Sequence, residues 1–117
     1  RSVQRVNPDK SLTFYCAVET GIVMTAMEPE SLLDSVRTQI EAAERVVGPP
    51  LVTIGCDCFL RRLEAELTGE VEAVSQFLRH HNVIGFNTYG EQFDGMHINQ
   101  TFTGVVIGQP DVRSGQD

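Results

Sequence analysis

Three cysteines and three histidines are the side chains of this sequence that could support metal or nucleophile chemistry. Cys56 and Cys58 flank Asp57, and in a strand two residues at this spacing point to the same face, where a histidine could complete a tetrahedral zinc site. The sequence has no second C-x-x-C or H-x₃-H pattern, and cysteine is among the residue types most often buried. We therefore expect cysteines of the core or of a pocket wall, and no metal site.

A catalytic cysteine would need a neighbouring base and a third group that orients the base. Cys58 with His97 and Asn99 is the set that the sequence offers. Any chain with three cysteines and three histidines yields such a trio by chance, so we do not expect an enzyme. His97 also follows Met96, and it is the candidate for a haem ligand, although a surface or hydrogen-bonded histidine is the commoner outcome.

Arg61 and Arg62 stand near the start of a predicted helix, where the helix dipole disfavours cations. At least one of them is expected at the surface. An arginine that points inward needs an anion, which could be Asp57, Glu91 or the carboxylate of a ligand. Arg61 is therefore the most informative charged residue of the sequence.

The segment from Gly85 to Glu91 combines two glycines, two aromatic residues and a carboxylate. Glycine inside a strand can mark the close approach of another backbone or of a ligand. The alternative is a strand end followed by a turn, with Tyr89 half exposed. The glycine spacing does not match a phosphate-binding loop.

Composition restricts the class of protein. The chain has 117 residues, 41% of them hydrophobic, which suits one globular domain with its own core. Its net charge of −7 argues against binding to nucleic acid or anionic membranes. The apolar runs are short and interrupted, and the odd number of cysteines fits a reducing compartment. We expect a soluble cytoplasmic protein.

Periodicity and breaker residues predict the elements that position these side chains. Strands are expected at Leu12 to Val18 and Ile22 to Met27, as a hairpin around Gly21. A helix begins near Ser31 and ends at Gly48-Pro49-Pro50. The remaining predicted elements are a strand at 51–56, helices at 58–67 and 69–80, and strands at 83–88 and 99–107.

The order β-β-α-β-α-α-β-β predicts an α+β fold, with a mostly antiparallel sheet and helices packed mainly on one face. We expect residues 1–10 to form a linker or entry segment, residues 11–107 to form the domain and residues 108–117 to form a flexible tail.

Three ordered motifs resemble the C-terminal domain of the FIST family (FIST C). They are C-x-x-R at Cys58–Arg61, I-G-F-x-T-x-G-E at Ile84–Glu91 and H-x-N-x-T-x-T at His97–Thr103. With the upstream hairpin and long helix, the resemblance covers about residues 3–107.

The resemblance implies a non-catalytic sensory module of a signal-transduction protein that binds a small ligand such as an amino acid. A haem-binding nitric-oxide sensor and a protein-interaction domain without a ligand are the alternatives. The positions that the resemblance marks, with Tyr89 added, form the predicted ligand site: Cys58, Arg61, Gly85, Tyr89, Gly90, Glu91, Asn99 and Thr101. For an amino acid, Arg61 would hold the carboxylate and Glu91 the ammonium group.

The resemblance also implies partners. An N-terminal FIST half and signalling or F-box domains are expected in the parent protein, because the chain lacks an initiator Met and resembles a fragment. Without that half, the chain is expected to expose an apolar face through which it could dimerise.

Overall fold

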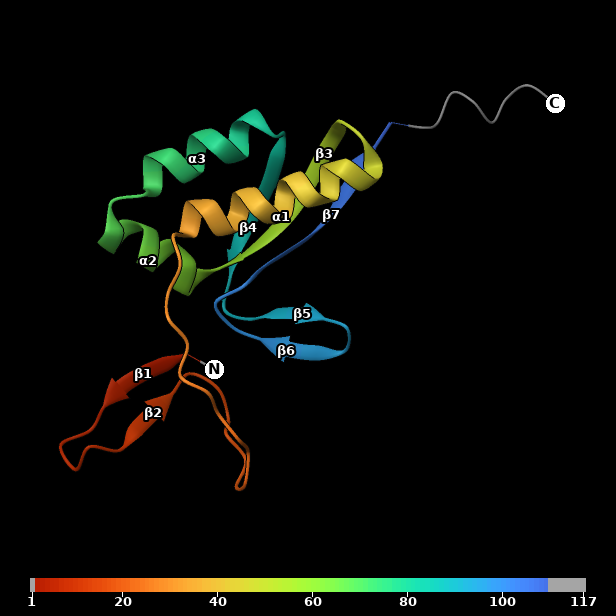
Figure 1. The fold of residues 1–117 in the computed structure, drawn as a ribbon. Helices are drawn as coiled ribbons and strands as arrows, with labels where there is room; N and C mark the ends of the chain where they lie inside the picture. Colours follow the sequence, from red (N-terminus) through yellow and green to blue (C-terminus); the bar gives the residue numbers. More distant parts are fainter. Residues whose placement is uncertain (1, 110–117) are drawn as a thin grey trace.

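The computed structural model describes residues 2–109 as an α+β fold (Figure 1). The elements, in chain order, are β1 (Val3–Val6), β2 (Leu12–Phe14), α1 (Leu32–Val47), β3 (Pro50–Cys58), α2 (Phe59–Thr68), α3 (Val71–His80), β4 (Val83–Thr88), β5 (Glu91–Phe93), β6 (Met96–Ile98) and β7 (Phe102–Gly108). The predicted class and element order are confirmed. The short hairpin β5–β6 is added between the last two predicted strands, in a stretch for which the sequence predicts no element.

The central sheet has the strand order β4-β3-β7. Strand β3 pairs antiparallel with β7 and parallel with β4, because α2 and α3 form the crossover that returns the chain to the same end of the sheet. The two hairpins, β1–β2 and β5–β6, are antiparallel. The three helices lie on one face of the central sheet (Figure 1).

Helix α1 forms where its capping residues and its apolar stripe predict it. The Ser31 hydroxyl accepts a hydrogen bond from the Asp34 N–H at 3.3 Å, and Gly48 ends the helix with a φ of 77°. The helix buries Leu32, Val36 and Ile40. Leu32 joins Ala65 of α2 and Val74 of α3 in the core cluster, so the three helices share one apolar centre.

The N-terminal hairpin differs from the prediction. Residues 22–27 form no strand, and β2 pairs instead with β1, which lies in the segment that we expected to be a linker. A tight turn closes this hairpin: the Lys10 N–H donates to the Asn7 carbonyl at 2.9 Å, and Lys10 has a φ of 68°. The hydrogen bonds of this turn favour local pairing over the more distant apolar run at 22–27. The predicted tail at 108–117 falls almost wholly outside the described residues.

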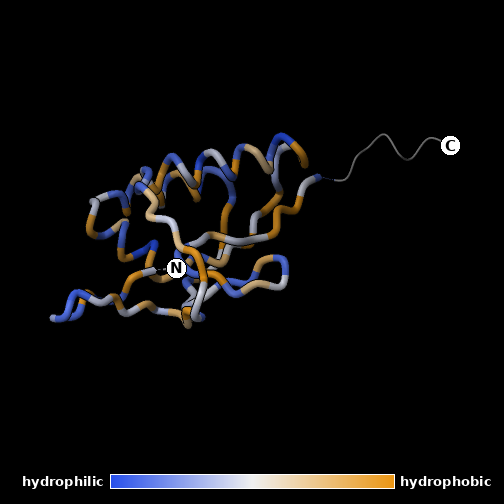
Figure 2. The backbone as a smooth tube through the Cα atoms, turned by 60° about the horizontal axis from the view of Figure 1, so that its bottom comes forward, coloured by the Kyte–Doolittle hydropathy of each residue, from blue (hydrophilic) through white to orange (hydrophobic). Residues whose placement is uncertain are grey.

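The sheet face that points away from the helices is apolar and open to solvent. The exposed fractions are 44% for Ile54, 60% for Ile84, 64% for Phe86, 63% for Val105 and 43% for Ile107. Ile54 pairs in register with Ile84 on one side and with Val105 on the other, so the patch crosses all three strands. Figure 2 shows hydrophobic stretches, in orange, along these central strands. We call these five residues the open sheet face.

Candidate functional site

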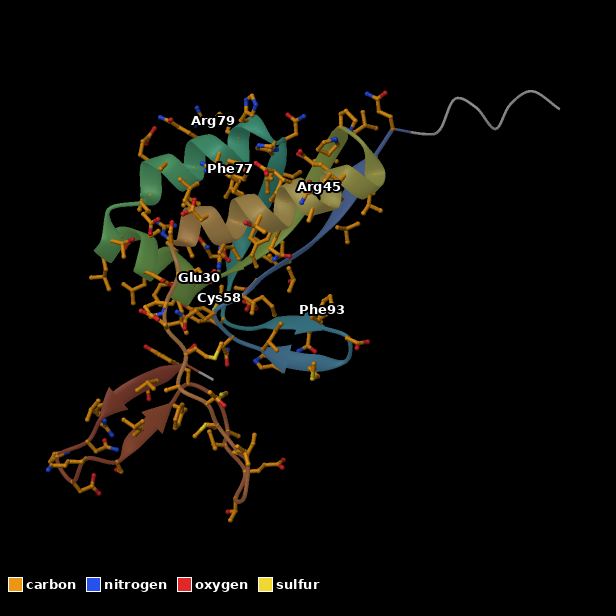
Figure 3. All side chains as sticks on the ribbon, in the orientation of Figure 1. Glu30, Arg45, Cys58, Phe77, Arg79 and Phe93 are labelled. Atoms are coloured by element: carbon orange, nitrogen blue, oxygen red, sulfur yellow. The ribbon has the colours of Figure 1, made fainter. Side chains whose placement is uncertain are left out.

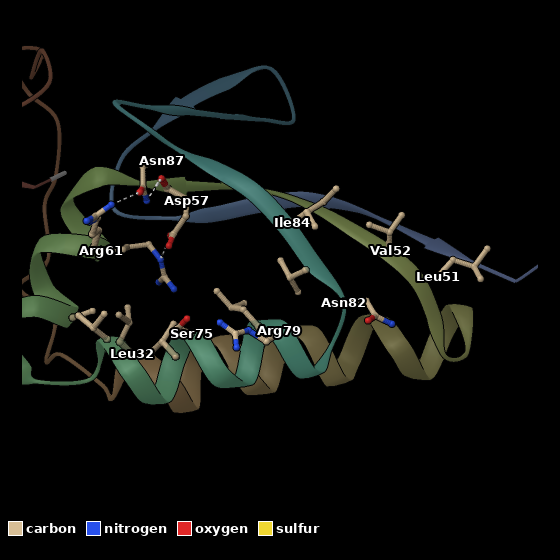
Figure 4. A pocket seen from close by; sticks show the side chains of 16 residues that line it. Leu32, Leu51, Val52, Asp57, Arg61, Ser75, Arg79, Asn82, Ile84 and Asn87 are labelled. Atoms are coloured by element: carbon tan, nitrogen blue, oxygen red, sulfur yellow. Dashed lines mark hydrogen bonds and ion pairs between the residues drawn. The ribbon is translucent and has the colours of Figure 1, made fainter.

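A pocket of about 780 Å³ lies between the helix-facing side of β3–β4 and helices α2 and α3 (Figure 4). Its apolar wall consists of Leu32, Ala65, Val74 and Leu78 of the core cluster and its surroundings, together with the more exposed Val71. Polar side chains face the same space: Asp57, Arg61, Arg62, Ser75, Arg79, Asn82 and Asn87. Concave sites that combine an apolar wall with a few polar groups are typical of small-molecule binding.

Arg61 and Asp57 form the buried ion pair of this pocket. Asp57 lies near the carboxyl end of β3, Arg61 lies in the first turn of α2, and the Arg61 Nε to Asp57 Oδ1 distance is 2.7 Å. Arg61 is only 7% exposed and therefore points inward, and Asp57 is the anion that pairs with it. The bond uses one nitrogen and one carboxylate oxygen, and within residues 2–109 the structure gives no hydrogen bond to the Arg61 Nη groups or to Asp57 Oδ2, which are therefore open to a ligand.

Burial raises the pKa of Asp57 above its ordinary value. The Arg61 guanidinium opposes this rise, and the negative charge of Glu91 adds to it. Asp57 is therefore a carboxylate whose charged form needs a cation nearby.

The two other arginines of the pocket differ in their partners. Arg62 Nε lies 3.0 Å from Glu66 Oε1, and its Nη1 donates to the Asn87 side chain at 3.5 Å. Arg79 lies on the side of α3 that faces the pocket (Figure 4), and within residues 2–109 the structure gives it no ion pair.

A second polar cluster lies beside the carboxyl ends of β3 and β4, where the three sequence motifs meet. Glu91 is 2% exposed, and its two carboxylate oxygens accept hydrogen bonds from the hydroxyls of Thr88 and Thr101, the latter at 2.6 Å. The Cys58 N–H donates to the Thr101 carbonyl at 3.0 Å. Glu91 therefore joins β5 to the segment before β7, and it does not line the pocket that contains Arg61.

Other predicted site residues surround this second cluster. Asn99 donates from Nδ2 to the Tyr89 carbonyl at 3.3 Å, while its buried Oδ1 has no hydrogen-bond partner among the described residues. The Tyr89 side chain is 88% exposed, more than predicted, and its ring contacts Phe59 at a centroid distance of 5.7 Å. Gly90 lies against the His97 ring, where a Cβ atom would collide with that ring.

Gly85 confirms that glycine marks a close backbone approach in this chain. Gly85, Gly55 and Gly104 stand in register across β4, β3 and β7. A Cβ on Gly85 would collide with the Gly55 carbonyl oxygen, so the neighbour is a strand. A Cβ on Gly55 would collide with the Phe102 ring, so this glycine leaves room for an aromatic side chain.

The candidate cysteine and histidine chemistry has little support in this geometry. Cys58, at the junction of β3 and α2 (Figure 3), is 1% exposed. His97 lies on β6, its Nδ1 is 2.9 Å from Gln92 Nε2, and it lines neither this pocket nor the smaller one between α1 and the end of α3. Within residues 2–109 no group of three or more His, Cys, Asp or Glu side chains is arranged to hold a metal ion.

The structure thus divides the predicted site residues between two places. Arg61 lines the pocket, whereas Cys58, Tyr89, Gly90, Glu91, Asn99 and Thr101 belong to the second cluster and Gly85 to the sheet. Sequence reasoning did not assign a ligand-facing role to either Asp57 or Arg79. The four-residue spacing of Asp57 and Arg61 was the signal for their pairing, whereas Arg79 had no such signal.

Comparison with known proteins gives one match. The family model described as FIST C domain matches residues 1–94, which include the Cys58–Arg61 and Ile84–Glu91 motifs. Neither a comparison with curated proteins nor one with solved structures finds a match. Among the helices of the described part, none is long and apolar enough to cross a membrane.

Proposed function

Because the chain belongs to the FIST C domain family, whose members are sensory domains of signal-transduction proteins, we propose that it binds a small molecule in the pocket around Asp57 and Arg61. The observation that carries this proposal is the Asp57–Arg61 ion pair, in which only one nitrogen of Arg61 and one oxygen of Asp57 take part. Both charged groups are largely buried, both face the pocket, and each retains hydrogen-bonding capacity toward it.

An α-amino acid complements this arrangement. The Nη groups of Arg61 suit a carboxylate, since the planar guanidinium can donate two parallel hydrogen bonds. Asp57 Oδ2 suits an ammonium group, which would also relieve the cost of burying that carboxylate. The apolar wall of the pocket would receive the side chain of the ligand. In this proposal Asp57 takes the role that the sequence suggested for Glu91.

We propose a non-catalytic role for the chain in the cytoplasm. The buried Cys58 thiol supports the non-catalytic role, because a nucleophile must reach its substrate. His97, the candidate base, is hydrogen-bonded to Gln92 on the β5–β6 hairpin. The proposed partners of the parent protein are an N-terminal FIST half and a signalling or F-box domain. Haem binding through His97 is the competing proposal, and a Soret band after haem addition that disappears in His97→Ala would support it.

Calorimetric titration of the chain with each of the twenty amino acids tests the proposed site. For every amino acid that binds, Arg61→Gln is expected to weaken binding by about tenfold to a hundredfold, the loss typical of a charge-assisted hydrogen bond. Arg45→Gln, on the exposed face of α1, is the matched control and should leave the affinity unchanged. Melting temperatures measured for both variants show whether each one folds.

A second pair of variants separates the two candidate ammonium partners. Asp57→Asn should weaken amino-acid binding, whereas Glu91→Gln should have little effect, because both Glu91 oxygens accept threonine hydrogen bonds. The proposal is wrong if a folded Arg61→Gln variant binds all active ligands as well as the parent chain does.

A further inference from the structure

The pocket has more positive charge than a zwitterion can neutralise. Its lining contains three arginines, Arg61, Arg62 and Arg79, and one carboxylate, Asp57. Asp57 pairs with Arg61, and Glu66, which lies outside the lining, pairs with Arg62. Arg79 remains without an ion pair in the described part of a chain whose net charge is −7. An excess of cations in one concave place of an acidic protein indicates an anionic ligand.

The location of the Arg79 side chain is stronger evidence for a role in ligand binding than its charge alone. A cation in the last turn of α3 is favoured by the helix dipole, which explains the residue type but not the direction of the side chain. Ser75 and Arg79 are four residues apart on α3, so they share one face of the helix, and both line the pocket. Figure 4 shows both side chains on the side of α3 that faces the pocket.

The pocket therefore contains two sets of polar side chains that suit different groups of a ligand. The Asp57–Arg61 pair, at the junction of β3 and α2, accepts a carboxylate and an ammonium group together. The Arg79 guanidinium and the Ser75 hydroxyl, on α3, supply donors for a second anion. The same pocket is lined by the apolar side chains of Val71, Val74 and Leu78, which suit a short methylene chain.

We propose that the ligand is an acidic amino acid, or a close dicarboxylate analogue, whose second carboxylate is bound by Arg79. The inference rests on the proposed function, because the first carboxylate and the ammonium group use the Asp57–Arg61 pair. Arg79 then determines specificity, because it distinguishes acidic from neutral ligands.

Matched ligand pairs test this assignment, because L-glutamate and L-glutamine, like L-aspartate and L-asparagine, have the same shape and differ in one charge. By calorimetry, the parent chain is expected to bind the better acidic ligand at least about tenfold more tightly than its amide. Arg79→Gln should reduce that ratio to about one while amide binding stays the same. Arg79→Lys should retain part of the preference, since it keeps the charge but loses the planar donor pair.

Arg45→Gln is the control, since Arg45 is also an arginine in the last turn of a helix but lies outside this pocket (Figure 3). Arginine and glutamine have similar helix propensities, and Arg79 is exposed, so both variants should fold and melt as the parent does.

The outcomes separate the two proposals. If Arg61→Gln abolishes amino-acid binding but the parent binds glutamine as tightly as glutamate, the proposed pocket stands and the Arg79 assignment is wrong. An equal loss of glutamate and glutamine affinity in Arg79→Gln also overturns the assignment. If no amino acid binds, or Arg61→Gln changes nothing, the proposed function fails and this inference fails with it.

Discussion

Single residues of the pocket are arranged around one incompletely neutralised carboxylate. Asp57 is buried beside Arg61, yet the cost of its burial outweighs the stabilisation that Arg61 supplies, so its pKa is raised. Glu91 adds to the rise from the neighbouring cluster. The site is thus electrostatically prepared for a ligand cation at Asp57 and for a ligand anion at the free Arg61 donors.

The raised pKa of Asp57 predicts a pH dependence of stability. The folded chain retains the Asp57 proton at a pH at which the unfolded chain, with the ordinary pKa of 3.8, has released it. Between these two pKa values the folded state binds more protons, so the contribution of Asp57 to stability falls as the pH rises through this window. Denaturation at several pH values should show this fall, and Asp57→Asn should lack it.

Two variants test the causes of the shift by carboxyl NMR titration. Arg61→Gln should raise the pKa of Asp57 further, because the opposing cation is lost. Glu91→Gln should lower it, because a neighbouring negative charge is removed. A pKa of Asp57 at or below 3.8 in the parent chain would contradict the burial that the structure shows.

Among the elements, the central sheet depends on its row of glycines. Gly85, Gly55 and Gly104 lie side by side in β4, β3 and β7, so the backbones approach more closely there than side chains would allow. The parallel pairing of β3 with β4 also brings their carboxyl ends together, and Asp57 of the pocket and the Glu91 cluster both lie near this edge. Ligand sites of α/β proteins commonly use that edge.

The same glycine-to-alanine change should have different effects at two positions. Gly85→Ala is expected to destabilise the chain by roughly 1–3 kcal/mol, the cost of an overpacked site, because its Cβ meets the backbone of Gly55. Gly90→Ala should cost less, because its Cβ meets the His97 ring, a side chain that can turn aside. Urea denaturation measures both values. Equal losses, or no loss for Gly85→Ala, would show that the strands do not approach as described.

For the whole molecule, the unequal covering of the sheet is the main feature. Within residues 2–109, six hydrophobic residues are buried, and all but Cys58 lie on the three helices. The open sheet face, in contrast, is uncovered. Asp57 is the single charged residue of β3, β4 and β7, and it faces the pocket on the helix side. The open sheet face therefore has no charge of its own, although the chain has a net charge of −7.

We propose that a second copy of the chain covers the open sheet face when the chain is alone in solution. Two uncharged apolar faces can meet without the repulsion that other surfaces of an acidic chain would cause. Sedimentation equilibrium should show a dimer that Phe86→Glu converts to monomer. Val46→Glu, at an equally apolar and 85% exposed position on α1, should leave the dimer intact. A parent chain that is monomeric at every concentration would refute the proposal.

Local patterns in the sequence determined the fold class, the order of the main elements and the family. Capping residues, glycine–proline breaks and apolar periodicity are encoded within short stretches, which is why α1 and β3 lie close to their predicted ranges. The sequence also offered Asp57 as one candidate anion for an inward-pointing Arg61, because Asp57 lies only four residues before it in the chain.

Tertiary structure decided which distant residues meet. Glu91 binds Thr88 and Thr101 because β5 folds back beside the start of β7, and Arg79 reaches the pocket because the α2–α3 crossover places α3 over the sheet. Such contacts depend on strand register and on the path of the chain, which residue spacing alone does not encode.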